Sequence, residues 1–354
     1  MKPFKWGMLT PTFYLTLFLL SMSFAASAQN YLPYFRTVAR AETFLMDSLY
    51  EESLQRFDSA FHLVPYAQPK DLYLAAQVSA YLNQNQRCYN YLITGFVNGI
   101  PQSVLENNPY LKRWTSTEWG KKLTQSRLDS LYAVNEERIN TWYKKRMAAL
   151  YRQDQLLRDS CHLPVDSFPG GQQQKNLLYQ KWMKQADRQS RQIMRYTVKY
   201  GFPSFQVIGC DDKRYFEDSD DGVGSKYGSI ILYHSKTSWD LFKNVLMTQL
   251  EQGNLIPKQY ALIRDFAARN YQTGYRPNAK YGNYVYYIRW NDQKKTPWST
   301  TKLKWVNKNR YEIGLPPYRV YEKKENMAEQ YFWGRVTLFE HVAPIFDLMT
   351  LDVD

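Results

Sequence analysis

Small and aromatic residues alternate at a fixed spacing over residues 41–65, and no other feature limits the possible folds as much. The pattern runs small, aromatic, small, aromatic, small and then terminating, at Ala41, Phe44, Ser53, Phe57, Ala60 and Pro65. Small side chains let two antiparallel helices approach closely, and large ones fill the seam between them. The spacing therefore predicts a helical hairpin that ends near Pro65.

A weaker copy of this pattern follows about one period later. It has Ala75 and Ala76 in a first helix, then Cys88, Leu92 and Gly95 in a second. Both copies resemble the tetratricopeptide repeat, and this resemblance implies two helical hairpins over residues 29–106. Because two repeats leave an apolar face uncovered, we expect them to dock on the following region. A structural cap and a peptide-binding groove are both open, and the small number of repeats favours the cap.

The first residues have the order of a secretory signal peptide. Lys2 and Lys5 precede an apolar run over residues 13–24, which gives way to small residues at 25–28. A basic segment, an apolar segment and an Ala-x-Ala cleavage site follow one another in this way. The run is much shorter than the roughly 20 apolar residues of a transmembrane helix. We therefore expect cleavage after Ala28, a mature chain that starts at Gln29, and a periplasmic or secreted protein without a transmembrane segment.

Length, charge and cysteine number narrow the class of protein further. Removal of residues 1–28 from 354 leaves 326 residues, which is enough for two domains with hydrophobic cores. The net charge is +13, and the two lysines of the leader bring the mature chain near +11. The basic residues are dispersed, so a solvated basic surface that attracts an anionic surface polymer or another envelope protein is expected, and nucleic acid is not. The odd number of cysteines, Cys88, Cys161 and Cys210, favours three free thiols.

Helical spacing dominates the rest of the chain. Residues 107–127 break the repeat pattern with Pro109, Trp114, Trp119 and Gly120, and they predict a linker with aromatic anchors. Beyond it, the spacing of apolar residues predicts four helices, over residues 121–160, 173–200, 238–252 and 257–271.

Signals for strands come late in the sequence. Residues 283–290 alternate in polarity, and residues 301–306 could pair with them in a small antiparallel β-hairpin. The acidic, Gly-rich segment 218–228 lacks the ligand order and closing Glu of an EF-hand, so it predicts a loop and not a calcium site. The expected fold is mainly α, with tetratricopeptide-like helical hairpins followed by a mostly helical domain over residues 128–354.

A set of short motifs is scattered over residues 147–324. In chain order its members are Asp154, Gln155, Arg158, Gly201, Pro203, Gly209, His234, Tyr260, Ala261, Asp265, Tyr281, Gly282, Arg310, Ile313, Gly314, Leu315, Pro316 and Pro317. By their order and spacing this region resembles an uncharacterised bacterial family, a domain of unknown function. The family comes without an established activity. Read from its residues alone, the last motif resembles a helix end, with Gly314 in the turn and prolines that block continuation.

Five of these residues form the candidate site: His234, Asp154, Arg158, Asp265 and Tyr281. In one hypothesis they gather in the cleft of a periplasmic hydrolase-like enzyme, with His234 as general base and an acid that orients it. In the other hypothesis each residue is structural. Asp154 and Arg158 then form an ion pair four residues apart on a helix, a second such pair begins at Asp265, and His234 is a hydrogen-bonded core residue.

Motifs for metal, nucleotide or covalent chemistry are absent from the sequence. It has no His-Glu-x-x-His, no phosphate loop and no Gly-x-Ser-x-Gly, and His62, His162 and His341 are widely separated. No cofactor and no metal are therefore expected. The leading hypothesis is an exported envelope protein without enzymatic activity. It would bind a partner protein or surface polymer through its helical repeats and its many Tyr and Trp side chains, which suit half-wet interfaces.

Overall fold

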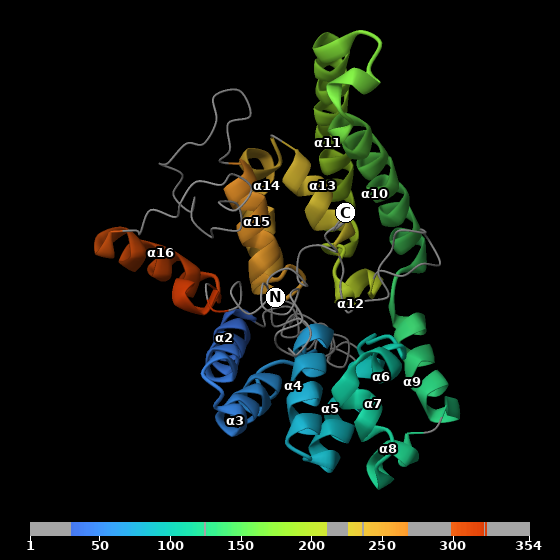
Figure 1. Cartoon of the computed structure of the whole chain (residues 1–354), viewed down its shortest axis with the longest axis vertical. Helices are drawn as coiled ribbons and strands as arrows, with labels where there is room; N and C mark the ends of the chain where they lie inside the picture. The colour runs from blue at the N-terminus through green and yellow to red at the C-terminus, as the bar shows by residue number, and fades with distance from the viewer. Residues whose placement is uncertain are drawn as a thin grey trace, which may run out of the picture.

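The computed structural model describes residues 30–123, 125–210, 226–235, 237–267, 299–321 and 323. Within these residues the chain is mainly helical and no strand occurs. Figure 1 shows helices α2 to α8 in one layer, with α10 to α15 stacked on it and α10 and α11 rising side by side to one end of the molecule. None of the described helices has both the length and the apolar character that a membrane crossing requires.

Two helical hairpins form the N-terminal layer, as the spacing of small and large residues predicts. They are α2 (Leu32–Met46) with α3 (Tyr50–Phe61), and α4 (Pro69–Tyr81) with α5 (Asn85–Val97). Ala41, Phe57 and Ala60 are fully buried in the first hairpin. The hydroxyl of Ser53 donates to the carbonyl oxygen of Ala41 at 2.9 Å, which only a close approach of the two helices allows. We call α2 to α5 the repeat region.

The predicted linker over residues 107–127 is wrong, because most of it is helical. Three short helices occur, α6 (Val104–Asn107), α7 (Pro109–Trp114) and α8 (Glu118–Lys122). The Asn108 side chain accepts from the backbone N–H groups of Tyr110 and Leu111, and Thr117 accepts from Gly120. Such caps satisfy the free N–H groups at helix starts, so one-turn helices form where proline and glycine suggest a loop.

The single helix predicted over residues 121–160 is divided. α9 (Gln125–Arg138) ends before Ile139, and α10 (Thr141–His162) begins after Asn140. The Asn140 side chain accepts from the N–H of Tyr143 at 2.9 Å, and its own N–H donates to the carbonyl oxygen of Val207 at 2.9 Å. This tertiary hydrogen bond and the cap replace the helical bonds that would have continued α9.

The following helices agree with their predicted ranges where the structure describes them. After a short 3-10 turn (Val165–Ser167) come α11 (Gly171–Tyr200), α12 (Phe205–Ile208), α13 (Tyr227–His234), α14 (Ser238–Glu251) and α15 (Pro257–Ala267). α10 and α11 pack against each other as a long hairpin, and α13 packs on both.

The strand predicted over residues 301–306 is wrong, since these residues belong to α16 (Thr300–Glu312). Ser299 caps the helix by accepting from the N–H of Lys302 at 3.3 Å. Val306, Asn309 and Arg310 are buried at helical spacing, which burial along a strand would not give. The partner strand predicted at residues 283–290 lies outside the described residues.

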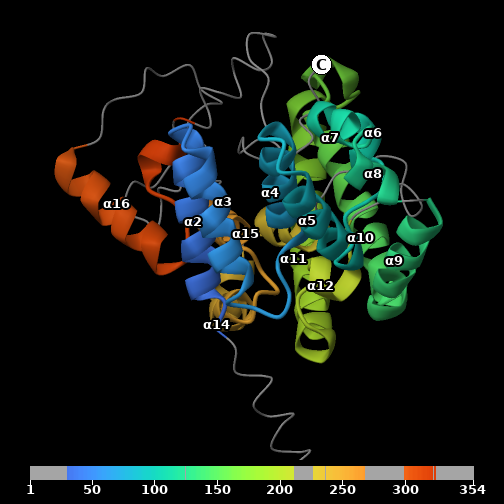
Figure 2. The same ribbon diagram turned by 90° about the horizontal axis from the view of Figure 1, so that it is seen from below.

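The turn predicted after Arg310 is confirmed. α16 ends at Glu312, Gly314 has a φ of +83°, and Arg310 Nε donates to the carbonyl oxygen of Pro316 at 2.7 Å. A Cβ at Gly314 would lie 2.5 Å from the Cβ of Phe35 on α2, so this turn packs directly on the repeat region. Figure 2 shows α16 beside α2.

The repeat region packs on the C-terminal helices through backbone and side-chain contacts. The N–H of Tyr31 donates to the carbonyl oxygen of Glu251 at 2.7 Å, and the amide of Gln68 donates to that of Gly253 at 2.7 Å. One cluster of buried apolar side chains runs without a break from Tyr31 to Val320. The two predicted domains therefore share one core.

All three cysteines are buried free thiols. Burial raises the pKa of the Cys88 thiol and of the Cys161 thiol. The thiol of Cys210 donates to the carbonyl oxygen of Gly99 at 2.9 Å, so this side chain contributes a hydrogen bond between the repeat region and the segment after α12.

Candidate functional site

Asp154 is the centre of a buried polar cluster between α10, α11 and α13. Its Oδ1 accepts a hydrogen bond from Trp182 Nε1 at 2.9 Å, and its Oδ2 accepts one from Gln155 Nε2 at 2.8 Å. His234 Nδ1 lies 2.7 Å from the same Oδ2. A buried carboxylate is tolerated when donors surround it, and here three donors face the two oxygens.

His234 is the last residue of α13, and every residue of this helix is buried. The histidine itself is 5% exposed, and its ring meets the edge of Trp182 with ring centres 4.8 Å apart. Because an ionised carboxylate can only accept, we assign the Nδ1 proton to the bond with Asp154. No described residue hydrogen-bonds Nε2 of His234, so this nitrogen can accept or donate a proton. The pair has the geometry of an imidazole oriented by a carboxylate, in a nearly enclosed position.

A second buried network fixes the turn that follows His234. Asp187 Oδ1 on α11 accepts from the hydroxyl of Ser235 at 2.7 Å and from that of Thr237 at 3.2 Å. Ser190 Oγ lies 3.2 Å from Ser235 Oγ and also donates to the carbonyl oxygen of Asp187. These bonds hold the end of α13 against α11, and they position the imidazole of His234 indirectly.

Sequence reasoning did not find Trp182 or Asp187. Both lie on α11 and face α10 or α13, and their roles depend on how these helices pack in three dimensions. Neither residue is part of a recognisable motif. The only signal available was that a long helix with one acidic residue, Asp187, must use that residue either at the surface or in a specific contact.

The other candidate residues are not brought to His234 by the described structure. Arg158 donates from Nε and Nη2 to Asp159 at 2.9 and 2.7 Å, so the predicted ion pair with Asp154 is wrong. The reason is that Asp154 points into the interior while Arg158 lies near the surface. The side chain of Asp265 and all of Tyr281 lie outside the described residues, as does the second ion pair predicted at Asp265.

Metal binding was examined in the same residues. Among the described residues, no three His, Cys, Asp or Glu side chains lie close enough to hold a metal ion together. Most of the segment 218–228, predicted to be a loop and not a calcium site, lies outside the described residues.

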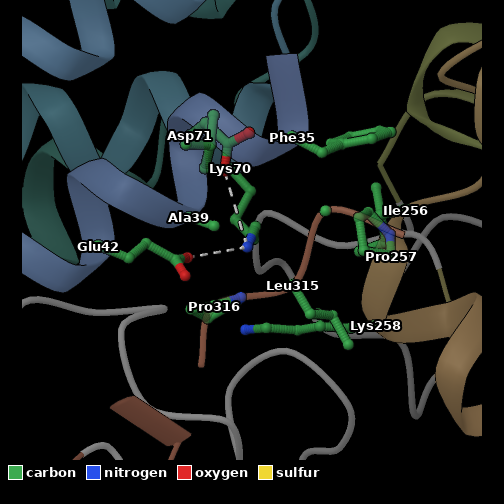
Figure 3. A pocket seen from close by; sticks show the side chains of 12 residues that line it. Phe35, Ala39, Glu42, Lys70, Asp71, Ile256, Pro257, Lys258, Leu315 and Pro316 are labelled. Carbon is green, nitrogen blue, oxygen red and sulfur yellow. Dashed lines mark ion pairs between the residues drawn. The ribbon is translucent and has the colours of Figure 1, made fainter. Parts of the chain in front are cut away.

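A small pocket with buried charges lies where α2 and α4 meet α15 and the turn after α16 (Figure 3). Lys70 Nζ lies 3.8 Å from Glu42 Oε1 and 3.7 Å from Asp71 Oδ1, and Tyr34 Oη donates to Asp71 Oδ2 at 2.6 Å. Burial raises the pKa of Asp71 in spite of the nearby Lys70. The pocket has a volume of about 30 Å³, which suits one or two water molecules. It is a polar junction between the two regions and is too small for an organic ligand.

An aromatic cluster lies where α10 begins and α11 ends. We call Trp142, Tyr143, Tyr196 and Tyr200 the aromatic platform. Trp142 is 54% exposed, and its ring centre lies 5.6 Å from that of Tyr196 and 6.0 Å from that of Tyr200. Tyr143 is buried beneath, with ring centres 5.4 Å from Tyr196 and 5.6 Å from Tyr200. The buried ring supports three rings that reach the surface.

Basic residues surround the aromatic platform. Residues 141–153 and 188–200 contain no Asp or Glu, and their basic residues are Lys144, Lys145, Arg146, Arg152, Arg188, Arg191, Arg195 and Lys199. Lys199 Nζ lies 4.9 Å from the ring centre of Tyr200, a cation–π distance. Gln192 Nε2 donates to Tyr196 Oη at 2.8 Å. The platform is therefore apolar in its rings and positive around them.

No family model, no curated protein and no solved structure matches this chain. The resemblances to the tetratricopeptide repeat and to a family of unknown function therefore stay expectations from the sequence. Any function has to be argued from the geometry of the chain itself.

Proposed function

We propose that this protein is exported to the bacterial envelope and binds an anionic surface polymer, such as an acidic polysaccharide, on the aromatic platform. One observation carries the proposal: Trp142 is 54% exposed in a cluster of four rings that basic residues surround. Exposing a large aromatic side chain is unfavourable unless a partner covers it. The apolar face of a sugar ring can stack on Trp142, while acidic groups of the polymer meet the surrounding cations.

A titration of Trp fluorescence tests this proposal. The protein is mixed with an acidic polysaccharide and, separately, with a neutral polysaccharide of similar length. We expect a saturable change with the acidic polymer that weakens as salt is added, because exposed charges are screened. Trp142→Ala should abolish the change. The matched control is Trp305→Ala, since Trp305 is 37% exposed on α16, away from the platform. Equal loss in both variants, or equal binding of the neutral polymer, would contradict the proposal.

Export has its own test. The full chain is expressed in a bacterial host, and the intact mass of the protein in the envelope fraction is measured. We expect a mass that corresponds to a chain beginning at Gln29. Retention of residues 1–28 would refute export by a cleaved signal peptide, without affecting the binding measured on the platform.

A hydrolase-like reaction at His234 is the second candidate function, and the contact of 2.7 Å between His234 Nδ1 and Asp154 Oδ2 favours it. In this reaction Nε2 of the neutral imidazole takes a proton from a water molecule. The water oxygen bonds to the substrate carbonyl carbon, and the proton then passes to the leaving oxygen as its bond breaks. The test is hydrolysis of a panel of aryl esters. We expect turnover that His234→Gln abolishes, and rates equal to buffer alone would exclude this function for the panel.

A further inference from the structure

Basic side chains gather at the end of α10, beside the buried His234. Arg158 and His162 are four residues apart on α10 and therefore share one face, and Arg158 lies one turn beyond Asp154. Lys175 Nζ donates to the carbonyl oxygen of Leu163 at 2.6 Å, which places its ammonium group at the C-terminal end of the same helix. α13 packs against both α10 and α11 in this part of the molecule (Figure 1).

These basic groups are close enough to repel one another. The pKa of His162 is lowered by burial first, and then by the charges of Arg158, Lys175 and His234. Asp159 acts in the opposite direction, but it already accepts two hydrogen bonds from Arg158. The other carboxylate nearby is that of Asp154, whose oxygens face inward to Trp182, Gln155 and His234. Cations around a shared space favour the binding of an anion.

We propose that Arg158, His162 and Lys175 form an anion-binding site beside His234 for a phosphate, sulfate or carboxylate group. The site goes beyond both functions proposed above, because anion binding requires neither the polymer nor a reaction. It is also distinct from the aromatic platform. Trp142 and His162 lie near opposite ends of α10, a helix of 22 residues, which is about 30 Å long at 1.5 Å per residue.

A purely structural explanation of these cations is available and has to be distinguished. The C-terminal end of a helix carries partial negative charge, and Lys, Arg and His side chains are stabilised there without any ligand. This explanation predicts that an added anion competes with the helix end only weakly and without saturation. The proposed site predicts saturable binding centred on His162.

The experiment is a titration of the protein with inorganic phosphate, sulfate and acetate, followed by the imidazole C–H resonances in NMR spectra. We expect saturable shifts of the His162 resonance, and a rise in the pKa of His162 at saturating phosphate because the anion stabilises the imidazolium form. Lys175→Gln should weaken phosphate binding by about tenfold, the effect of one charge-assisted hydrogen bond. Stronger binding of phosphate and sulfate than of acetate would identify a site for tetrahedral anions, and equal binding one for carboxylates.

Lys184→Gln is the matched control. Lys184 lies nine residues after Lys175 on α11, which is half a turn away around the helix, and it is exposed. Its substitution should leave phosphate binding unchanged. If Lys175→Gln does not fold, as judged by circular dichroism, Arg158→Gln takes its place. Shifts that do not saturate, an unchanged pKa of His162, or equal weakening by Lys184→Gln would each overturn the proposal.

Discussion

Two buried carboxylates, one in the repeat region and one in the α10–α11 hairpin, are accommodated in different ways. Asp71 accepts one short hydrogen bond from Tyr34, and its charged neighbour Lys70 stays 3.7 Å away. Asp154 accepts from Trp182 and Gln155, and contacts His234 at 2.7 Å. The first lies at a junction between two regions, and the second joins three helices of one region.

The difference shows what each buried charge is suited for. Donors on both oxygens of Asp154 stabilise the ionised form, which can then orient the imidazole of His234. Burial outweighs the neighbours of Asp71 and raises its pKa, so there the protonated form is favoured. A carboxylate without enough donors costs stability, whereas one with three donors specifies how its helices pack.

The largest expected effect concerns the dependence of the repeat region on the rest of the chain. A fragment of residues 29–106 should lack a cooperative thermal transition in circular dichroism. Its apolar face is covered in the whole protein by the segments that contact Tyr31, Phe35 and Gln68. A cooperative melt of the isolated fragment would show an independent domain, and it would break the view that the two regions share one core.

Asp154→Asn should be the most destabilising conservative substitution at the two carboxylates. The new amide presents N–H groups to donors that need an acceptor, so the free energy of unfolding should fall by about 3 kcal/mol. Urea unfolding measures it. Asp159→Asn is the control on the same helix, and its exposed pair with Arg158 should contribute less than about 1 kcal/mol. A loss no greater than that of the control would mean that the donors around Asp154 do not matter.

Gly253→Ala tests the junction between the regions. Gly253 has a φ of +77°, and a Cβ there would lie 2.5 Å from the ring of Tyr31. The left-handed backbone and the steric overlap together should lower the free energy of unfolding by about 2 kcal/mol. Gly171→Ala is the matched control, since its φ is +55° and no atom lies within 4 Å of its added Cβ. Its cost should be limited to the backbone and be measurably smaller.

Asp71→Asn should have the smallest effect and the opposite sign to Asp154→Asn. The folded pKa of Asp71 is raised above the unfolded value. The folded state therefore holds the proton to higher pH, and stability falls as pH rises from the unfolded pKa through the folded one. Asn removes this loss, so unfolding in urea at neutral pH should show an unchanged or higher free energy. A clear loss would show that the Asp71 charge is needed.

The sequence predicted the elements whose packing is local. The two hairpins of the repeat region follow from the spacing of residues such as Ala41 and Phe57, because close helix packing requires it. The division at Asn140 could not be predicted, since it depends on a hydrogen bond to Val207, 67 residues later, which is 207 minus 140. Residues 301–306 alternate like a strand, and only burial around Val306 and Arg310 decides for a helix.

The candidate site was predictable in its central pair and not in its surroundings. A histidine that ends an apolar run needs a polar partner, and Asp154 was one of two acids proposed for His234. Arg158 was assigned to Asp154 by helical spacing alone, but spacing does not say which side of α10 faces the core. The contribution of Trp182 requires the register of α11 against α10, and no short motif encodes that register.

The buried thiols bear on how the chain reaches its folded state. Once folded, Cys88 and Cys161 are protected, because burial keeps them as unreactive thiols rather than thiolates. In an oxidising compartment outside the cytoplasm, the unfolded chain presents all three thiols to oxidants, and an odd number cannot pair completely. Burial and oxidation are then competing rates, and each chain oxidised first is lost to a state that cannot close its core. The yield of an exported protein of this kind would depend on folding speed more than on final stability.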